Sequence, residues 1–137
     1  MTADETPTIP EGDSAFMRAA GFRFDEVGPT AVSGWIDLGP EHHQPWGLVH
    51  GGVYTTAIET AASVGASTAA AQYGLVAVGV NNNTNFVRSM VSGRVDVRAT
   101  AIQQGRTAQL WEVRVTDADD RLVAIGQVRL QNVTPRT

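Results

Sequence analysis

One carboxylate in an unusual setting is the first residue of this sequence that could perform chemistry. Glu59 lies in the stretch from Val53 to Ala71, where nearly every other residue is Ala, Val, Ile, Ser, Thr or Gly. Charged side chains are rarely buried in such surroundings unless they have a task. Ser63 follows four residues later, so on a helix its hydroxyl would share a face with Glu59 and could bind the carboxylate or a water molecule beside it. Glu59 is therefore a candidate nucleophile or general base.

A pair of glycines before this stretch offers a complementary function. At the start of a helix, Gly51 and Gly52 would supply backbone N–H groups at the positive end of the dipole, with no Cβ to block close approach. Such N–H groups can bind a carbonyl oxygen or an oxyanion. Upstream, Gln44 and His50 can donate to the same oxygen or orient a ligand. With Glu59, these residues predict acyl transfer to water, in which one group polarises a carbonyl and a carboxylate attacks it or activates water.

Helix geometry then predicts that two chains share the site. Eight residues at a rise of ~1.5 Å separate Gly51 from Glu59 by about 12 Å along one helix. A single carbonyl cannot lie within about 3 Å of both groups. If the two cooperate, they come from different chains whose helices pack antiparallel about a twofold axis. The distance holds only if the helix begins near Gly51.

Local patterns predict the elements that position these residues. A short helix is expected first, with Asp13 or Ser14 as its N-cap and Gly21 as its stop. Apolar residues at helical spacing predict one long helix, and its many small residues would let a sheet approach closely. Alternating apolar and polar residues predict strands on both sides of that helix. In chain order, the predicted elements are a helix over 12–20, strands over 22–27 and 30–38, a loop to Val49, the helix over 50–73, and strands over 75–90, 93–104, 107–116 and 121–131.

This order predicts an α+β fold in which a curved antiparallel sheet of five to six strands wraps a long central helix. The free edge of such a sheet invites pairing with a second copy. We expect residues 1–11 to be a disordered tail, 12–132 a single domain and 133–137 a C-terminal tail. No repeat or low-complexity tract suggests a second unit.

Composition limits the classes of function. The chain has 137 residues and a net charge of −4, and its ten basic residues are all Arg, which is not the basic excess of a nucleic-acid-binding protein. Without Cys, it has no disulfide, thiolate nucleophile or thiolate metal site. No apolar run approaches the roughly 18 residues of a membrane span, and the N-terminal residues lack the apolar core of a secretory signal. We therefore expect a cytoplasmic protein that contacts neither nucleic acid nor membrane.

Three segments together resemble a known family. Residues 44–63 carry Q-x5-HGG-x6-E-x3-S, residues 82–89 carry N-x-x-N-F-V-R-S, and residues 105–107 read G-R-T. In this register and chain length, they resemble the hotdog-fold acyl-CoA thioesterases of the PaaI-like family over roughly residues 15–131. They are most similar to the branch that hydrolyses aromatic acyl-CoA such as hydroxybenzoyl- or dihydroxynaphthoyl-CoA. The resemblance implies a hotdog homodimer that assembles into a homotetramer and uses no metal or redox cofactor, coenzyme A being part of the substrate.

The resemblance also implies a role for each site residue. Gly51 N–H would polarise the thioester carbonyl, with Gln44 assisting at that oxygen and His50 supporting the loop. Glu59 of the partner chain would be the nucleophile or general base, and Ser63 would hold the water or the carboxylate. Phe86 departs from the pattern, because some relatives carry there a His that reaches the nucleotide, which puts this contact in question. The positions implied for substrate and coenzyme binding are Gly52, Asn85, Phe86, Arg88, Ser89, Gly105, Arg106 and Thr107.

The sequence leaves other interpretations of its function open. The same fold could serve a non-catalytic acyl-CoA binder or sensor, or a hydratase or dehydratase, although the H-F-P-G and D-x-N-x-x-H patterns of such relatives are missing. The sequence lacks the G-x-S-x-G turn of a serine hydrolase. A metal site formed by His42, His43 and His50 is also disfavoured, because no carboxylate falls at helical spacing beside them. Glu59 could also be a solvated residue on a helix edge. Trp46 could line the acyl pocket or fill the core, and aromatic, medium-chain and branched acyl groups are all possible.

Overall fold

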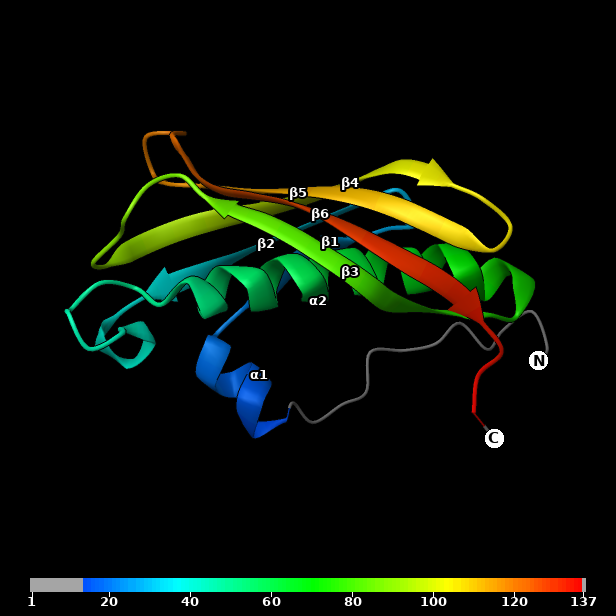
Figure 1. Ribbon diagram of the computed structural model, residues 1–137, viewed down its shortest axis with the longest axis horizontal. Helices are drawn as coiled ribbons and strands as arrows, with labels where there is room; N and C mark the ends of the chain where they lie inside the picture. Colours follow the sequence, from blue (N-terminus) through cyan, green and yellow to red (C-terminus); the bar gives the residue numbers. More distant parts are fainter. Residues whose placement is uncertain (1–13, 137) are drawn as a thin grey trace.

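A long helix crosses one face of a curved six-stranded sheet in the computed structural model, which describes residues 14–136 (Figure 1). This is the predicted α+β arrangement, with the sheet at six strands. The N-terminal tail expected over residues 1–11, and residues 12 and 13 of the first predicted helix, lie outside the described residues. The helices and strands are α1 (Ala15–Ala20), β1 (Arg23–Val27), β2 (Ala31–Leu38), η1 (Pro40–His42), α2 (Gly51–Ala70), η2 (Ala71–Tyr73), β3 (Val76–Phe86), β4 (Gly93–Gln104), β5 (Ala108–Thr116) and β6 (Leu122–Val133).

Helix α2 begins where the glycine pair predicts and is packed tightly against the sheet. His50 is its N-cap, in extended backbone conformation, and Gly51 is its first helical residue. Small residues on its inner face allow the close approach: a Cβ on Gly65 would lie 2.5 Å from the ring of the fully buried Trp111. The α-helix ends at Ala70, three residues before the predicted end, and the chain continues as the 3₁₀ turn η2 up to Gly74, whose φ of 70° favours glycine.

All strand pairs are antiparallel, in the order β1-β2-β4-β5-β6-β3, so β1 and β3 form the two edges. The predicted alternation is confirmed on the central strands, where apolar side chains point to α2 and charged ones point away. Apolar side chains that are at most 1% exposed lie between the sheet and α2, and they include Val32, Ile36, Ile58, Val95, Val97, Trp111, Val113, Val115, Val123, Val128 and Leu130.

Strand β3 ends at Phe86, four residues before the predicted end. The backbone N–H groups of Val87 and Arg88 both donate to the carbonyl oxygen of Val123, which stops the regular ladder with β6. The following residues turn toward the start of α2, where Val49 N–H donates to the carbonyl oxygen of Met90 at 2.9 Å. The segment after β3 is thus placed beside the glycine pair.

The outer edge of β3 is long and unpaired within the described chain. It spans 11 residues, and Val78 and Val80 are 44% and 56% exposed. A long edge strand with exposed valines is a ready surface for pairing with another strand. Along residues 14–136, no helix has the length and apolar character needed to cross a membrane.

Candidate active site

The Glu59 carboxylate lies between α2 and β3 and is held at both oxygen atoms. Ser63 Oγ donates to one oxygen, Oε2, at 3.2 Å, as the spacing of four residues on α2 predicts. Asn82 Nδ2, from β3, donates to the other oxygen, Oε1, at 3.4 Å. The side chain is half-buried, so Glu59 is not the fully solvated helix-edge residue of the alternative interpretation. A carboxylate held in this way keeps a fixed direction while part of it stays accessible.

Neighbouring groups fix the orientation of the Asn82 amide. Thr84 Oγ1 donates to Asn82 Oδ1 at 2.7 Å, so the Nδ2 group must point the other way, toward α2. There it donates to the carbonyl oxygen of Thr55 at 3.3 Å as well as to Glu59. The order Thr84, Asn82, Glu59, Ser63 is therefore a single chain of hydrogen bonds from β3 to α2.

Gly79 leaves the space that the carboxylate occupies. A Cβ at this position of β3 would overlap Glu59 Oε2, and β3 is irregular at the same place, between Gly79 and Asn81. A glycine inside a strand often marks such a close approach of another group.

Replacing Gly79 with Ala is accordingly expected to push the carboxylate away from its position. A displacement of about 1 Å at a reacting group costs on the order of a hundredfold in rate. We expect kcat, measured in a steady-state assay, to fall roughly tenfold to a hundredfold. Circular dichroism shows whether the variant is folded. Gly28→Ala is the matched control, since a Cβ there makes only ordinary contact at 3.4 Å. Wild-type kcat in a folded Gly79→Ala protein would show that the position of Glu59 is unimportant.

The N-terminus of α2 presents one free donor. His50 Nδ1 accepts from Gly52 N–H at 2.8 Å, and the carbonyl oxygen of His50 accepts from Val53 N–H. Within residues 14–136, Gly51 N–H meets no acceptor, so it is the N–H of this turn that remains for a ligand. The structure thus places His50 as the helix cap, and its ring occupies the N–H of Gly52.

A cavity of about 470 Å³ surrounds Gly51. Phe86 forms one wall, so close to Gly51 that a Cβ there would lie 2.8 Å from Cζ of the ring. Gln44 lines the cavity, although its Oε1 accepts from the backbone N–H of Trp46. The cavity brings together seven of the predicted site residues, namely Gln44, His50, Gly51, Gly52, Phe86, Arg88 and Ser89, beside Leu48, Val49, Tyr54 and Val87.

Glu59 lines a different cavity, of about 370 Å³, with Asn82 and three threonines of α2. Phe16 and Met17 of α1 lie over it, and Phe16 remains 67% exposed. The two cavities have no lining residue in common. Because α2 begins at Gly51, the predicted separation of about 12 Å from Glu59 holds within one chain.

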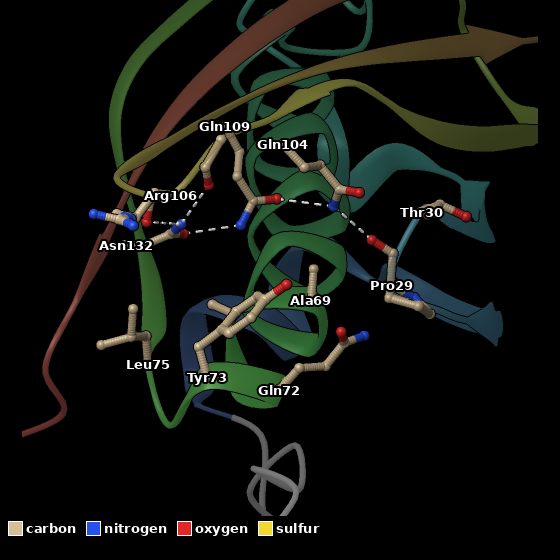
Figure 2. A pocket seen from close by; sticks show the side chains of 12 residues that line it. Pro29, Thr30, Ala69, Gln72, Tyr73, Leu75, Gln104, Arg106, Gln109 and Asn132 are labelled. Carbon is tan, nitrogen blue, oxygen red and sulfur yellow. Dashed lines mark hydrogen bonds between the residues drawn. The ribbon is translucent and has the colours of Figure 1, made fainter.

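The third predicted segment lies at the other end of α2. Gly105 and Arg106 line a cavity of about 700 Å³ between the C-terminal end of α2 and the β4–β5 turn (Figure 2). Gln109 ties this region together by donating to the carbonyl oxygen of Ala66 and to Asn132 Oδ1, at 3.0 and 2.9 Å. Thr107 is exposed in the turn, and Asn85 is exposed on β3. One chain therefore does not bring Arg106 and Arg88 into one cavity.

Each histidine has a structural contact of its own. His42 Nε2 is 3.0 Å from the carbonyl oxygen of Ala19, His43 Nε2 is 2.7 Å from that of Val91, and His50 caps α2. Across residues 14–136, no group of three His, Cys, Asp or Glu side chains could hold a metal ion. Trp46 is 84% exposed, so the suggestion that it fills the core is wrong, and it does not line the cavity around Gly51 either.

Three residues that the structure places at these sites have little signal in the sequence. Asn82 is the first residue of the N-x-x-N-F-V-R-S motif, and Gly79 is one glycine within a strand. Tyr54 stands one turn after Gly51 on α2 and lines the same cavity. A polar amide or a glycine in an otherwise valine-rich strand was the available signal, but only the fold shows that both face α2.

The chain is similar in sequence to proteins of one enzyme family. The family model described as the thioesterase superfamily matches residues 47–124. The protein Rv1847 of Mycobacterium tuberculosis, provisionally named an esterase, is 48% identical over 123 residues, which are 88% of each chain. A 1,4-dihydroxy-2-naphthoyl-CoA hydrolase of Listeria monocytogenes is 38% identical over 92 residues, covering 67% of this chain and 74% of that protein.

Solved structures extend the likeness to the fold. The structure of Rv1847 has a TM-score of 0.86 at 46% identity, covering 90% of this chain and 100% of the other. A thioesterase of Haemophilus influenzae, HI1161, has a TM-score of 0.82 at 26% identity, covering 89% and 85%. Since the family model spans more than half of the chain, this protein belongs to the thioesterase superfamily and has the hotdog fold, as the sequence predicted.

Proposed function

We propose that this thioesterase hydrolyses an acyl-CoA to a free acid and coenzyme A at a site shared by two chains. The observation that carries the proposal is the separation of Gly51 and Glu59 into two cavities of one chain. Each cavity holds half of what acyl transfer requires: a free N–H donor in one and an oriented carboxylate in the other. Only a second copy can supply the missing half to each.

Strand β3 is the edge through which the two chains would meet. Glu59 lies beneath Gly79 and Asn82, whereas Gly51 lies beneath Phe86, near the end of the same strand. Antiparallel pairing of β3 with its copy, about a twofold axis close to Asn82, brings the partner's Phe86 near Val78. The partner's Gly51 then lies close to Glu59, and the exposed edge valines are covered.

The same pairing offers one path for the coenzyme. It would lead the partner's segment 87–89, which follows β3, toward Leu75, which lines the cavity at the C-terminal end of α2 together with Arg106 (Figure 2). Arg88 of one chain and Arg106 of the other, which lie at opposite ends of a single chain, would then flank one groove. Two guanidinium groups along a groove suit the phosphates of coenzyme A. Assembly of such dimers into a tetramer stays a prediction.

The chemistry follows from these positions. The thioester carbonyl oxygen would accept from Gly51 N–H, which favours the charge that develops on it. The partner's Glu59 would attack the carbonyl carbon, forming an anhydride that water hydrolyses, or would take a proton from a water molecule that attacks. In both routes the C–S bond breaks and the sulfur leaves as a thiolate that takes up a proton. In the general-base route the oxygen of water ends in the free acid, whereas in the anhydride route it ends in the free acid or in the Glu59 carboxylate, according to which carbonyl carbon water attacks.

The walls of the Gly51 cavity favour an aromatic acyl group. Phe86 and Tyr54 have ring centroids 6.3 Å apart, and Leu48 and Val49 add apolar surface. These two rings contact each other, so a flat apolar group would pack against the surface they share with the aliphatic side chains. The Listeria relative named as a dihydroxynaphthoyl-CoA hydrolase has a substrate of this kind.

A panel of acyl-CoA thioesters, assayed for release of free thiol, tests the proposed function. We expect turnover with aromatic members, and lower kcat/KM with short straight-chain members. Saturable binding of acyl-CoA without any thiol release would instead identify a non-catalytic binder or sensor. Hydration of an enoyl-CoA without thiol release would identify a hydratase.

A further inference from the structure

Thr84 on β3 is linked to the Glu59 carboxylate through one intermediate side chain. Its hydroxyl donates to Asn82 Oδ1 at 2.7 Å, and Asn82 Nδ2 lies 3.4 Å from Glu59 Oε1. Both residues of β3 are half-buried, whereas their neighbours along the strand are exposed. The alternation of a strand therefore turns Thr84 and Asn82 to the same side, toward α2.

The hydroxyl matters because an amide group can be reversed. Asn82 carries a donor on one side of its amide and an acceptor on the other, so a turn of about 180° would present its oxygen to the Glu59 carboxylate. In the observed orientation, Nδ2 donates to the carbonyl oxygen of Thr55 as well as to Glu59. The amide oxygen then depends on Thr84 for its donor. Removing that hydroxyl leaves the oxygen unsatisfied and makes the observed orientation less favourable.

Gly126 on β6 leaves the space in which the hydroxyl lies. It is the cross-strand partner of Thr84, and a Cβ on this buried glycine would lie 2.6 Å from Thr84 Oγ1. The side chain of a β-branched residue is also restricted in its rotation about the Cα–Cβ bond. The hydroxyl is thus confined, and the chain of contacts that ends at the carboxylate on α2 begins at β6.

Thr84 lies behind the site and does not form its wall. Among residues 14–136, Asn82 lines the cavity that holds Glu59, whereas Thr84 lines neither that cavity nor the one around Gly51. A change at Thr84 therefore removes no contact with a substrate bound in either cavity. Its effect on the reaction passes through the direction of the carboxylate, so it changes kcat and leaves KM nearly constant.

We propose that Thr84 is a positioning residue for the reaction, which acts on the Glu59 carboxylate through the Asn82 amide. This rests on the proposed thioesterase function and adds to it a residue that does not touch the substrate. The Thr84 hydroxyl keeps the amide donor aimed at Oε1, while Ser63 holds Oε2. The carboxylate is then held from the sheet and from its own helix, and its direction is set before the thioester arrives.

The variants Thr84→Val and Thr84→Ser form the decisive pair. Valine keeps the shape of the side chain and removes the donor, whereas serine keeps the donor. We expect Thr84→Val to lower kcat roughly tenfold with KM within about twofold of wild type, and Thr84→Ser to restore kcat to within about twofold. The loss is smaller than the hundredfold or so of a 1 Å displacement, because Ser63 still holds the carboxylate.

Thr116→Val is the matched control, since Thr116 is also half-buried on a strand but lines a hollow on the face of the sheet away from α2. This variant should keep the wild-type kcat. Wild-type kcat in Thr84→Val, or an equal loss in Thr84→Ser, would overturn the proposal.

Solvent exchange of the Asn82 side-chain amide, measured by NMR on ¹⁵N-labelled protein, tests the positioning without any substrate. The Asn82 signals are identified by their absence from the spectrum of Asn82→Asp. We expect their exchange to be roughly threefold faster or more in Thr84→Val than in wild type, and close to wild type in Thr84→Ser. Unchanged exchange in Thr84→Val would mean that the hydroxyl does not hold the amide, and the proposal would fail. A wild-type protein that hydrolysed no thioester would contradict the proposed function alone, because amide exchange still decides what Thr84 holds in place.

Discussion

Replacing Glu59 with Gln is expected to lower kcat by roughly 10²- to 10⁴-fold, the range that a positioned acid or base contributes. The change keeps the shape of the side chain, so Ser63 and Asn82 retain a partner and the fold is undisturbed. What is lost is the negative charge that attacks the carbonyl or accepts a proton from water. KM should change little, because the glutamine side chain fills the same space and the residues that line the Gly51 cavity are unchanged.

Glu112→Gln is the matched control for this variant. Glu112 is also half-buried, but it lies on the outer face of β5 opposite Thr100 and Gln127, away from α2. The Glu112→Gln variant should hydrolyse the best substrate of the acyl-CoA panel at the wild-type rate. If Glu59→Gln did the same, the carboxylate mechanism would have to be abandoned.

Mixing two inactive variants is expected to restore activity, and this result tests the sharing of the site between chains. One variant is Glu59→Gln and the other is Gly51→Pro. Proline removes the N–H donor at the first helical position, and the extended backbone of His50 suits a following proline. Its Cβ also displaces the Phe86 ring, which would lie 2.8 Å away, so this variant loses the Gly51 half of the site and keeps Glu59. Losing such a donor costs on the order of 10²- to 10³-fold in kcat.

The expected recovery of activity follows from random pairing of the two variants. After equal amounts are unfolded and refolded together, about half of the dimers contain one chain of each kind, by random pairing about the twofold axis. In each of these, the intact Gly51 of one chain meets the intact Glu59 of the other, while the second site has lost both groups. About one quarter of wild-type activity should therefore return.

Each variant refolded alone controls for recovery of the native protein, and gel filtration confirms that dimers form in the mixture. If both groups acted within one chain, no mixture of the two variants could contain an intact site. Activity at the level of the separate variants would then exclude a site shared through β3.

The start of α2 shows how far local sequence information reaches. His50, Gly51 and Gly52 gave the beginning of the helix to within one residue, because capping and glycine preferences act within one turn. The Glu59 to Ser63 hydrogen bond was likewise predictable, since side chains four residues apart on a helix are neighbours. Period-two alternation identified the faces of β4 and β5 for the same reason of local geometry.

Contacts between distant segments could not be read in this way. That Asn82 donates to Glu59, and that Gly79 makes room for it, depends on which residues of β3 face α2 after the irregularity between Gly79 and Asn81. A shift of one residue along a strand turns every side chain to the other face, so a local pattern with many asparagines left the register open. The exposure of Trp46 was hidden for a related reason, because loop packing is decided by distant partners.

The sequence alone thus determined the helix, the glycine pair, the carboxylate and the distance between them, because these follow from spacing along one helix. The tertiary structure decided that Gly51 and Glu59 lie in separate cavities and that Asn82 orients the carboxylate. These facts depend on how β3 and the segment after it lie against α2. That packing arises from the whole core and is not encoded in any one segment.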